Sequence, residues 1–178
     1  MSKMYFSNAQ IRVVSFQQEH LTQTYVNWLN DPEIVQFSEQ RHQTHTLESC
    51  TQYFNQQQVG NDLFLAIEAF EDSNQKHLGN IGVAIDKVNL YADISILIGE
   101  KNYWGKGIAF EAINGMIIYL REEENINQIT CGTMSCNIGM IKVMEKLGMN
   151  PKTTIPNRFI IDGDYYHLVQ GCLSRQIK

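Results

Sequence analysis

The sequence contains no run of 18 or more apolar residues, which is about the length that a membrane-spanning helix requires. Its first residues, Met1 to Phe6, lack the long apolar core of a secretory signal peptide. Basic residues are also few, because 14 Lys and Arg stand against 19 Asp and Glu, for a net charge of −5. These absences argue against a membrane partner and against nucleic acid, which favours strongly basic surfaces.

Cysteine is scarce, and the four cysteines show no Cys-x-x-Cys spacing. We therefore expect reduced, partly buried thiols of a cytoplasmic protein, and neither a disulfide framework nor a cysteine metal site. The spacing His42-x-x-His45 resembles half of a metal motif, but no third ligand accompanies it. No metal site is predicted.

The length of 178 residues fits one domain, residues 1–178, and 43% hydrophobic residues suffice for a sizeable core. The apolar periodicity predicts four helices, over about 21–29, 46–58, 107–124 and 137–148. It predicts seven strands, over 11–16, 63–70, 78–85, 91–98, 126–134, 158–161 and 164–169. This order indicates an α+β fold with a mixed central sheet.

Local signals mark several element ends. Ser15-x-x-Gln18 can act as a capping box for the first helix, and Asn30-Asp31-Pro32 can end it. Asn137 can cap the fourth helix, and Asp162-Gly163 is a strong hairpin signal.

The segment from Trp104 to Ala109, Trp-Gly-Lys-Gly-Ile-Ala, carries the clearest functional signal. It joins an apolar strand to an amphipathic helix, and its two glycines allow a tight turn with exposed N–H groups. The first N–H groups of a helix lack intrahelical partners and carry the positive end of its dipole. The segment therefore predicts an anion site suited to phosphate.

Two common phosphate motifs do not fit this segment. A P-loop requires Ser or Thr after Gly-Lys, whereas Gly107 follows Lys106 here. A dinucleotide-binding fold requires a third glycine where Phe110 stands, and an acidic residue about 20 positions later. The region from Asn127 to Thr133 offers no acid.

The segment resembles the pyrophosphate loop of the GNAT superfamily of N-acetyltransferases, Gln/Arg-x-x-Gly-x-Gly/Ala. Trp104, in place of the usual Gln or Arg, resembles the branch of ribosomal-protein alanine and polyamine acetyltransferases. The preceding Ala92 to Lys101 and the later Glu145 to Met149, Glu-Lys-Leu-Gly-Met, are similar to the same branch. The resemblance covers Ile11 to about Leu173.

This resemblance implies a GNAT-like, mixed, mostly antiparallel sheet of about seven strands flanked by four helices. It implies direct acetyl transfer from acetyl-CoA, as co-substrate, to a primary amine in a ternary complex, without a metal. The acceptor classes left open are an amino sugar, free or nucleotide-linked, a polyamine and a protein N-terminus. A homodimer is also left open.

The resemblance further implies the residues that hold acetyl-CoA. Ile98 and Gly99 are expected beside the pantetheine arm, and the backbone N–H groups from Gly105 to Ala109 on the pyrophosphate. The complete set of expected cofactor-binding residues is Ile98, Gly99, Trp104, Gly105, Lys106, Gly107, Ile108, Ala109, Asn137 and Lys146. The lysines also fit an ordinary solvated surface, and Asn137 also fits a helix cap.

Asp93, the only carboxylate in its strand, is the candidate general base, or else a structural hydrogen-bonding group. The general acid of relatives is missing, because Met140 and Met144 stand where they carry Ser or Tyr. Tyr103 is the candidate proton donor, with Cys136, Tyr165 and Tyr166 as alternatives. Unassisted departure of the thiolate is the other route.

Relatives recognise the acceptor through the region between the first two helices. The expected acceptor-binding residues are Trp28, Glu39, Arg41 and His42. Arg41 would suit an acidic or phosphate-bearing acceptor, and Trp28 also fits the core face of its helix.

Two further functions compete with acetyl transfer. A catalytically silent acyl-CoA-binding module would explain why Met140 and Met144 replace proton donors. A nucleotide-dependent kinase or ATPase rests only on Gly105-Lys106-Gly107, without a magnesium ligand.

Overall fold

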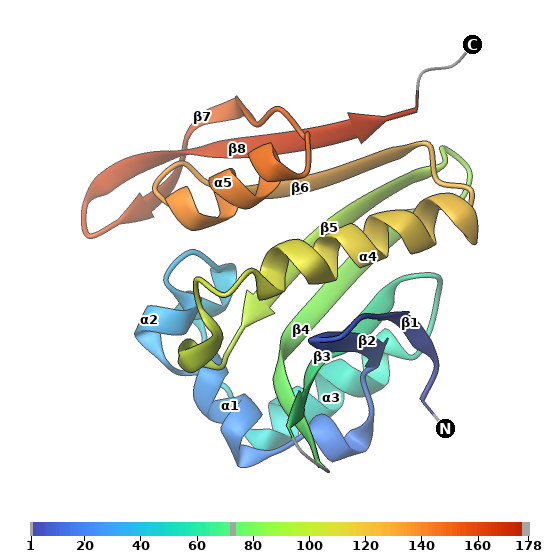
Figure 1. Cartoon of the computed structure of the whole chain (residues 1–178). Helices are drawn as coiled ribbons and strands as arrows, with labels where there is room; N and C mark the ends of the chain where they lie inside the picture. The colour runs from blue at the N-terminus through green and yellow to red at the C-terminus, as the bar shows by residue number, and fades with distance from the viewer. Residues whose placement is uncertain (1, 72–73, 176–178) are drawn as a thin grey trace.

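A computed structural model describes residues 2–71 and 74–175. One sheet contains eight strands in the order β1-β2-β3-β4-β5-β6-β8-β7 (Figure 1). The strands are β1 (Met4–Ser7), β2 (Ile11–Ser15), β3 (Leu63–Glu71), β4 (Asn74–Asp86), β5 (Tyr91–Ile98), β6 (Gln128–Met134), β7 (Lys152–Ile161) and β8 (Asp164–Ser174). Only β5 and β6 pair in parallel, so the mixed, mostly antiparallel sheet is confirmed. Seven strands were predicted, and the additional strand is β1, which the sequence pattern did not indicate.

The four predicted helices are present, accompanied by a fifth of a single turn and by three 3-10 turns. The helices are α1 (Gln23–Leu29), α2 (Pro32–Val35), α3 (Leu47–Gln57), α4 (Ile108–Glu122) and α5 (Ile138–Lys146). The 3-10 turns are η1 (Gln18–His20), η2 (Glu39–His42) and η3 (Lys101–Tyr103). Pro32, expected to end a helix, also begins α2, because proline suits the first helical position.

The capping box predicted at Ser15 and Gln18 is wrong. The box lies two residues later, between Gln17 and His20, and begins η1. The helix α1 starts only at Gln23, where the Thr22 hydroxyl accepts the N–H of Tyr25. His20 is buried, and its Nδ1 accepts the N–H of Gln17, which closes the box at η1 instead.

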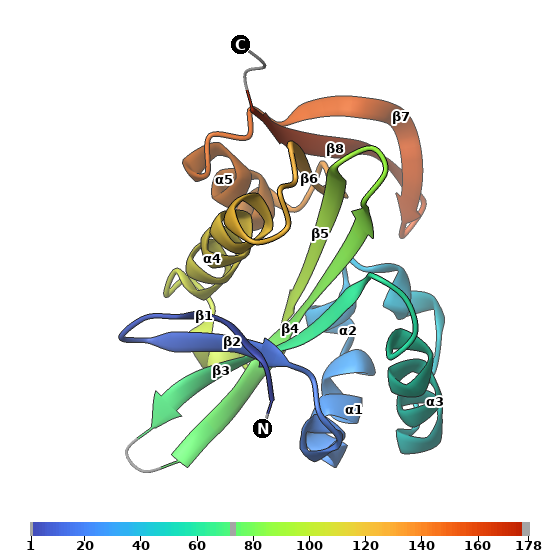
Figure 2. The same cartoon turned by 90° about the vertical axis from the view of Figure 1, so that its right-hand side faces the viewer.

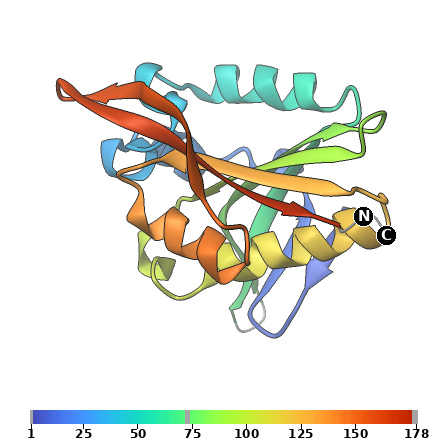
Figure 3. The ribbon, with the colours of Figure 1, turned by 90° about the horizontal axis from the view of Figure 1, so that it is seen from above.

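The helices cover both faces of the sheet. Figure 2 shows α4 and α5 on one face and α1, α2 and α3 on the other. Figure 3, from above, shows the twisted sheet between α3 and the pair α4 and α5. Apolar side chains of the sheet alternate between these faces: Ile94 joins the core under α4, whereas Leu97 packs against the core under α1.

The parallel pair β5 and β6 is only partly formed. Tyr91 to Ile94 pair with Gln128 to Cys131, and the strands then diverge toward α2 (Figure 1). A bulge in β4 leaves Leu78 as an extra residue, and its carbonyl accepts the N–H groups of Gly99 and Glu100. The divergence and this bulge fix where β5 ends.

The hairpin predicted at Asp162-Gly163 is confirmed. Both residues have positive φ, 52° and 90°, as a two-residue type I′ connection requires. The polar sequence from Glu71 to Gln75 also predicts a turn, and its residues 72–73 lie outside the described residues. Among the described residues, no helix has the length and apolar character to cross a bilayer.

Candidate functional site

The segment that joins β5 to α4 turns sharply at its two glycines. Gly105 and Gly107 have φ values of 72° and 83°, in the left-handed region that favours glycine. Gly107 is the N-cap of α4 and has no side chain to accept the first helical N–H groups. The predicted anion site therefore has the expected backbone form.

The N–H groups of this segment are available to a ligand. Lys106 donates its N–H to Tyr103, and Glu111 donates to Gly107. Within the described residues, no hydrogen-bond acceptor serves the N–H groups of Gly105, Gly107, Ile108 and Ala109. We call these donors the anion loop, and their direction along the α4 dipole suits a phosphate.

Two of the expected lysines lie beside the anion loop. The ammonium of Lys106 lies 5.1 Å from the centre of the Tyr103 ring, and that of Lys146 lies 5.0 Å from the Phe110 ring. Lys146 thus brings the end of α5 to the first turn of α4. Both ammonium groups therefore lie over aromatic rings that flank the anion loop in the sequence.

Three contacts involve the last residues of β5 and the glycine that follows them. The indole N–H of Trp104 donates to the Ile98 carbonyl at 2.9 Å. Gly99 donates its N–H to Leu78, so this donor is already used. A Cβ on Gly99 would lie 2.0 Å from the Trp28 ring, so only glycine fits here.

The turn after β6 positions Asn137. Its Oδ1 accepts the N–H of Met140 at 3.1 Å and caps α5, as predicted, and its Nδ2 donates to Thr133 at 3.0 Å. Met144 is fully buried and Met140 packs against the same core. Both methionines therefore fill apolar space, as the sequence indicated.

Asp93 lies at the last paired stretch of β5 and β6. Its carboxylate accepts a hydrogen bond from the Thr130 hydroxyl, which also contacts the Tyr91 hydroxyl at 2.7 Å. Burial raises the pKa of Asp93, and hydrogen bonds from Thr130 and Gln170 oppose that rise. Asp93 is thus a carboxylate shifted toward neutrality, which suits a base.

The structure does not bring Asp93 and Tyr103 together. Asp93 lies five residues before the end of β5, a distance of about 16 Å along the strand. Tyr103 lies in η3, where Lys76 and Lys106 approach its ring. Of the alternative proton donors, Cys136 is half-buried in the turn before α5, and burial raises its pKa, whereas Tyr165 is exposed in the β7–β8 hairpin.

A cavity of about 360 Å³ lies on the face of the sheet that α1 and α3 cover. The helices contribute Tyr25, Cys50 and Tyr53, and the strands contribute Phe64 and Asn80 among others. Its volume is within the usual range of small-molecule sites, roughly 300–1,000 Å³.

One wall of this cavity is β5 from Ser95 to Leu97, directly beyond the last β5–β6 pair. Asp93 is two residues before Ser95 on the same face of the strand, about 7 Å away. The cavity therefore adjoins the place where β5 and β6 diverge.

The expected acceptor residues lie around the cavity rather than in its wall. Trp28 is buried in the core, where it packs on Gly99 and, at 4.9 Å between ring centres, on His77. Glu39 and His42 are exposed. Arg41 donates to the Ser38 carbonyl at 2.8 Å and pairs with Glu39 at 3.0 Å, which holds η2 in shape.

The same loop instead contributes its neighbours Ser38, Gln40, Gln43 and His45 to the cavity. The sequence thus indicated the loop that borders the cavity, and the roles of Glu39, Arg41 and His42 toward an acceptor stay predictions. A usable signal for Asn80 did exist, since it is the only polar side chain between Leu78 and Ile85 of an otherwise apolar strand.

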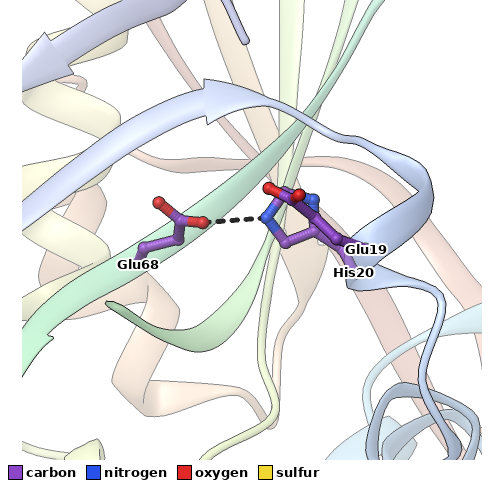
Figure 4. A group of neighbouring side chains, drawn as sticks. All are labelled: Glu19, His20 and Glu68. Atoms are coloured by element: carbon purple, nitrogen blue, oxygen red, sulfur yellow. Dashed lines mark hydrogen bonds and ion pairs between the residues drawn. The ribbon is translucent and has the colours of Figure 1, made fainter. Parts of the chain in front are cut away.

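Glu19, His20 and Glu68 form the one group of the described residues that could hold a metal (Figure 4). However, His20 Nδ1 accepts the N–H of Gln17 at 2.8 Å, and His20 Nε2 donates to Glu68 at 2.9 Å. Arg12 pairs with the other oxygen of Glu68. This cluster is therefore already satisfied as a buried hydrogen-bond network that ties η1 to β2 and β3.

Comparisons with known proteins agree with this geometry. A family model described as an acetyltransferase (GNAT) domain matches residues 10–150. A spermidine N-acetyltransferase from Vibrio cholerae, solved with CoA and spermine, superposes with a TM-score of 0.81 at 18% identity, over 94% of this chain and 96% of that one.

Two further solved structures share the fold. RimL, a ribosomal L7/L12 alpha-N-protein acetyltransferase in complex with coenzyme A, has a TM-score of 0.82 at 12% identity, over 97% of this chain and 98% of its own. MccE, the microcin C7 self-immunity acetyltransferase in complex with acetyl-CoA and AMP, has a TM-score of 0.78 at 18% identity, over 94% of each chain.

Proposed function

The chain belongs to the GNAT acetyltransferase family, and we propose that it transfers the acetyl group of acetyl-CoA to a primary amine. The observation that carries this proposal is the anion loop, which follows the unpaired end of β5 beyond the point where β5 and β6 diverge. Its N–H groups, with Lys106 and Lys146, supply the positive field that a pyrophosphate needs without magnesium.

In this proposal the diverging strands hold the pantetheine arm. Ile98 and Gly99 line its path at the end of β5, Trp104 covers that end, and Asn137 lies across the gap at the start of α5. The thioester is then presented toward the cavity at Ser95 to Leu97. Holding both reactants together can lower the barrier by roughly 7–11 kcal/mol.

The transfer requires few groups of the protein. The amine nitrogen attacks the thioester carbon, the new C–N bond replaces the C–S bond, and the amine proton passes to Asp93, directly or through a water. The thiolate takes up a proton as it leaves. Because neither Met140, which packs against the core, nor Met144, which is buried in it, can donate a proton, we favour departure without a dedicated acid. Tyr103 remains a proposed donor that the distance from Asp93 disfavours.

The first experiment is thermal unfolding with acetyl-CoA, with ATP and NAD as controls. Selective stabilisation by acetyl-CoA is expected, of about 2.7 kcal/mol when the ligand is at 100 times its dissociation constant. Stabilisation by ATP alone would overturn the proposal in favour of a nucleotide enzyme. Acetyl-CoA binding without thiol release for any amine would support the silent acyl-CoA-binding module.

Gly107 offers a sharper test of the anion loop. Asp and Asn have nearly the same shape and both tolerate the left-handed region, so they differ mainly in charge. Gly107→Asp should weaken acetyl-CoA binding at least tenfold more than Gly107→Asn, measured by calorimetry. Equal affinities of the two variants would contradict the pyrophosphate assignment.

Three further expectations belong to this proposal. The continuous sheet from β1 to β8 supports one domain over residues 1–178. The four free thiols support a cytoplasmic location, since they form no disulfide framework. A homodimer stays a prediction, which light scattering of the purified protein would check.

A further inference from the structure

Two residues that line the cavity described above each carry a buried polar atom without a hydrogen-bond partner. Within the described part of the chain, only three buried side-chain polar atoms lack a hydrogen bond, and His45 Nε2 and Asn80 Oδ1 are two of them. Both residues line the cavity. Because an unsatisfied buried polar group destabilises the folded state, two such atoms on residues of one cavity wall point to a polar ligand.

The backbone of His45 and the side chain of Asn80 are held in place by the fold. The backbone N–H of His45 donates to Asn30 Oδ1 at 2.8 Å, and Asn30 Nδ2 donates to the His45 carbonyl at 2.8 Å. Asn80 is only 7% exposed, and its amide also contacts Tyr25 and His77. The two anchors are therefore fixed before any ligand arrives.

The cavity contains no charged side chain. No Asp, Glu, Lys or Arg is among the described residues that line it. One amine could be held by His45 and Asn80, but the further ammonium groups of a polyamine would be buried without a carboxylate. A lysine-like amine has a pKa of about 10.4, whereas an α-amino group has about 7.7–8.0, so an uncharged cavity favours the weaker base.

The remaining wall is suited to hydroxyl groups. Ser38, Gln40, Gln43 and Ser95 offer hydroxyl and amide groups, and Tyr53 offers an aromatic ring. A hydroxyl can both donate and accept, so it satisfies Asn80 Oδ1 and either tautomer of His45. Amines flanked by hydroxyls and a ring oxygen are also weak bases, because those oxygens withdraw electron density.

We infer that this cavity binds an amino sugar as the acetyl acceptor, with His45 Nε2 and Asn80 Oδ1 as its specificity-determining anchors. The inference rests on the proposed acetyl transfer and adds the class of acceptor. It excludes polyamines, although the fold is shared with a spermidine enzyme.

The test measures thiol release from acetyl-CoA with three kinds of acceptor. The panel contains 2-amino and 4-amino hexoses, free and as nucleoside diphosphate esters, together with spermidine and an alanyl peptide. At least one amino sugar should exceed spermidine and the peptide by about tenfold or more in kcat/KM. Absence of release with every amino sugar, or preference for spermidine or the peptide, overturns the inference.

Variants test the two anchors. His45→Ala should raise the KM of the amino sugar about tenfold while the affinity for acetyl-CoA stays unchanged, and His45→Gln should restore part of the loss. Thr44→Ala is the matched control, since Thr44 is exposed in the same loop and outside the cavity wall. An unchanged KM in His45→Ala would remove the anchor role.

Asn80→Asp provides an independent readout. A carboxylate of the same shape should shift preference toward spermidine at least tenfold relative to the amino sugar, which a merely structural role of Asn80 would not do. An unchanged preference in a folded variant contradicts the inference. If the wild-type protein did not bind acetyl-CoA, the proposed function itself would be overturned. Failure of the acceptor inference and failure of the proposed function are therefore distinguishable.

Discussion

At the scale of single residues, Asp93 shows how burial can prepare a carboxylate for proton transfer. It lies in the strand that borders both the diverging edge of the sheet and the cavity, and burial raises its pKa. A carboxylate acts as a base only while it is deprotonated. A raised pKa of Asp93 lies closer to the pKa of the amine, so the transfer of a proton from the amine to Asp93 is less unfavourable.

Asp93→Asn should reduce kcat about 100-fold or more, because general-base catalysis typically contributes roughly 10²–10⁴. Acetyl-CoA affinity should not change, since Asp93 lies about 16 Å along β5 from the end of the strand that precedes the anion loop. Steady-state kinetics near neutral pH, with calorimetry for acetyl-CoA, checks both statements. Normal turnover would remove Asp93 from the mechanism.

Thr130 gives a graded version of this test. Its hydrogen bond lowers the pKa of Asp93, so Thr130→Val should raise that pKa further. Activity is lost as the pH falls through the pKa of a base, and the acid limb of the kcat/KM profile should therefore move to higher pH. An acid limb that stays in place would show that another group limits the rate at low pH.

At the scale of elements, the end of β5 depends on one close approach. Gly99 leaves room for the Trp28 ring, and Leu78 accepts two N–H groups from the same segment. Trp28, expected near the acceptor, is buried and packs on Gly99 at the end of β5.

Gly99→Ala should lower the free energy of unfolding by about 1–3 kcal/mol, because the added methyl overlaps the Trp28 ring. Gly132→Ala in β6 is the matched control, since its Cβ would meet Leu168 at an ordinary 3.5 Å. Urea denaturation of both variants checks the difference. Equal stabilities would mean that Trp28 can move away without cost.

At the scale of the whole molecule, the sheet separates two cores, and a partly buried histidine, His77, packs against the smaller one. His77 packs against Trp28 and Phe16 and donates from Nε2 to the Gly79 carbonyl at 3.0 Å. Burial lowers the pKa of His77 to about 4. The folded protein therefore keeps this ring neutral at pH values where the unfolded chain protonates it.

This difference predicts a pH dependence of stability. Above about pH 6.5 His77 is neutral in both states, and as the pH falls from there toward 4 only the unfolded state gains the proton. Stability should drop over that window by about 3 kcal/mol in total. Comparing urea denaturation of the wild type and His77→Phe between pH 6.5 and 5 checks this, because most carboxylates do not titrate there. Equal slopes would contradict it.

Features encoded by neighbouring residues were predictable. Asn137 caps α5, Asp162-Gly163 forms the hairpin, and β5 has the predicted bounds Tyr91–Ile98. In each case the signal is a local backbone preference or an apolar period, which the rest of the chain does not override. The short strand β1 was missed because it carries little apolar pattern and forms only by pairing with β2.

By itself, the sequence determined the acetyltransferase family and the anion loop, since glycines at positive φ and a helix start act within a few residues. Only the tertiary structure determined which residues line the cavity. His45 and Asn80 lie 35 positions apart, on a loop and on a strand, and no local pattern links them. Packing also placed Trp28 in the core and turned Glu39 and His42 outward, because the side of a short turn that faces inward depends on what it packs against.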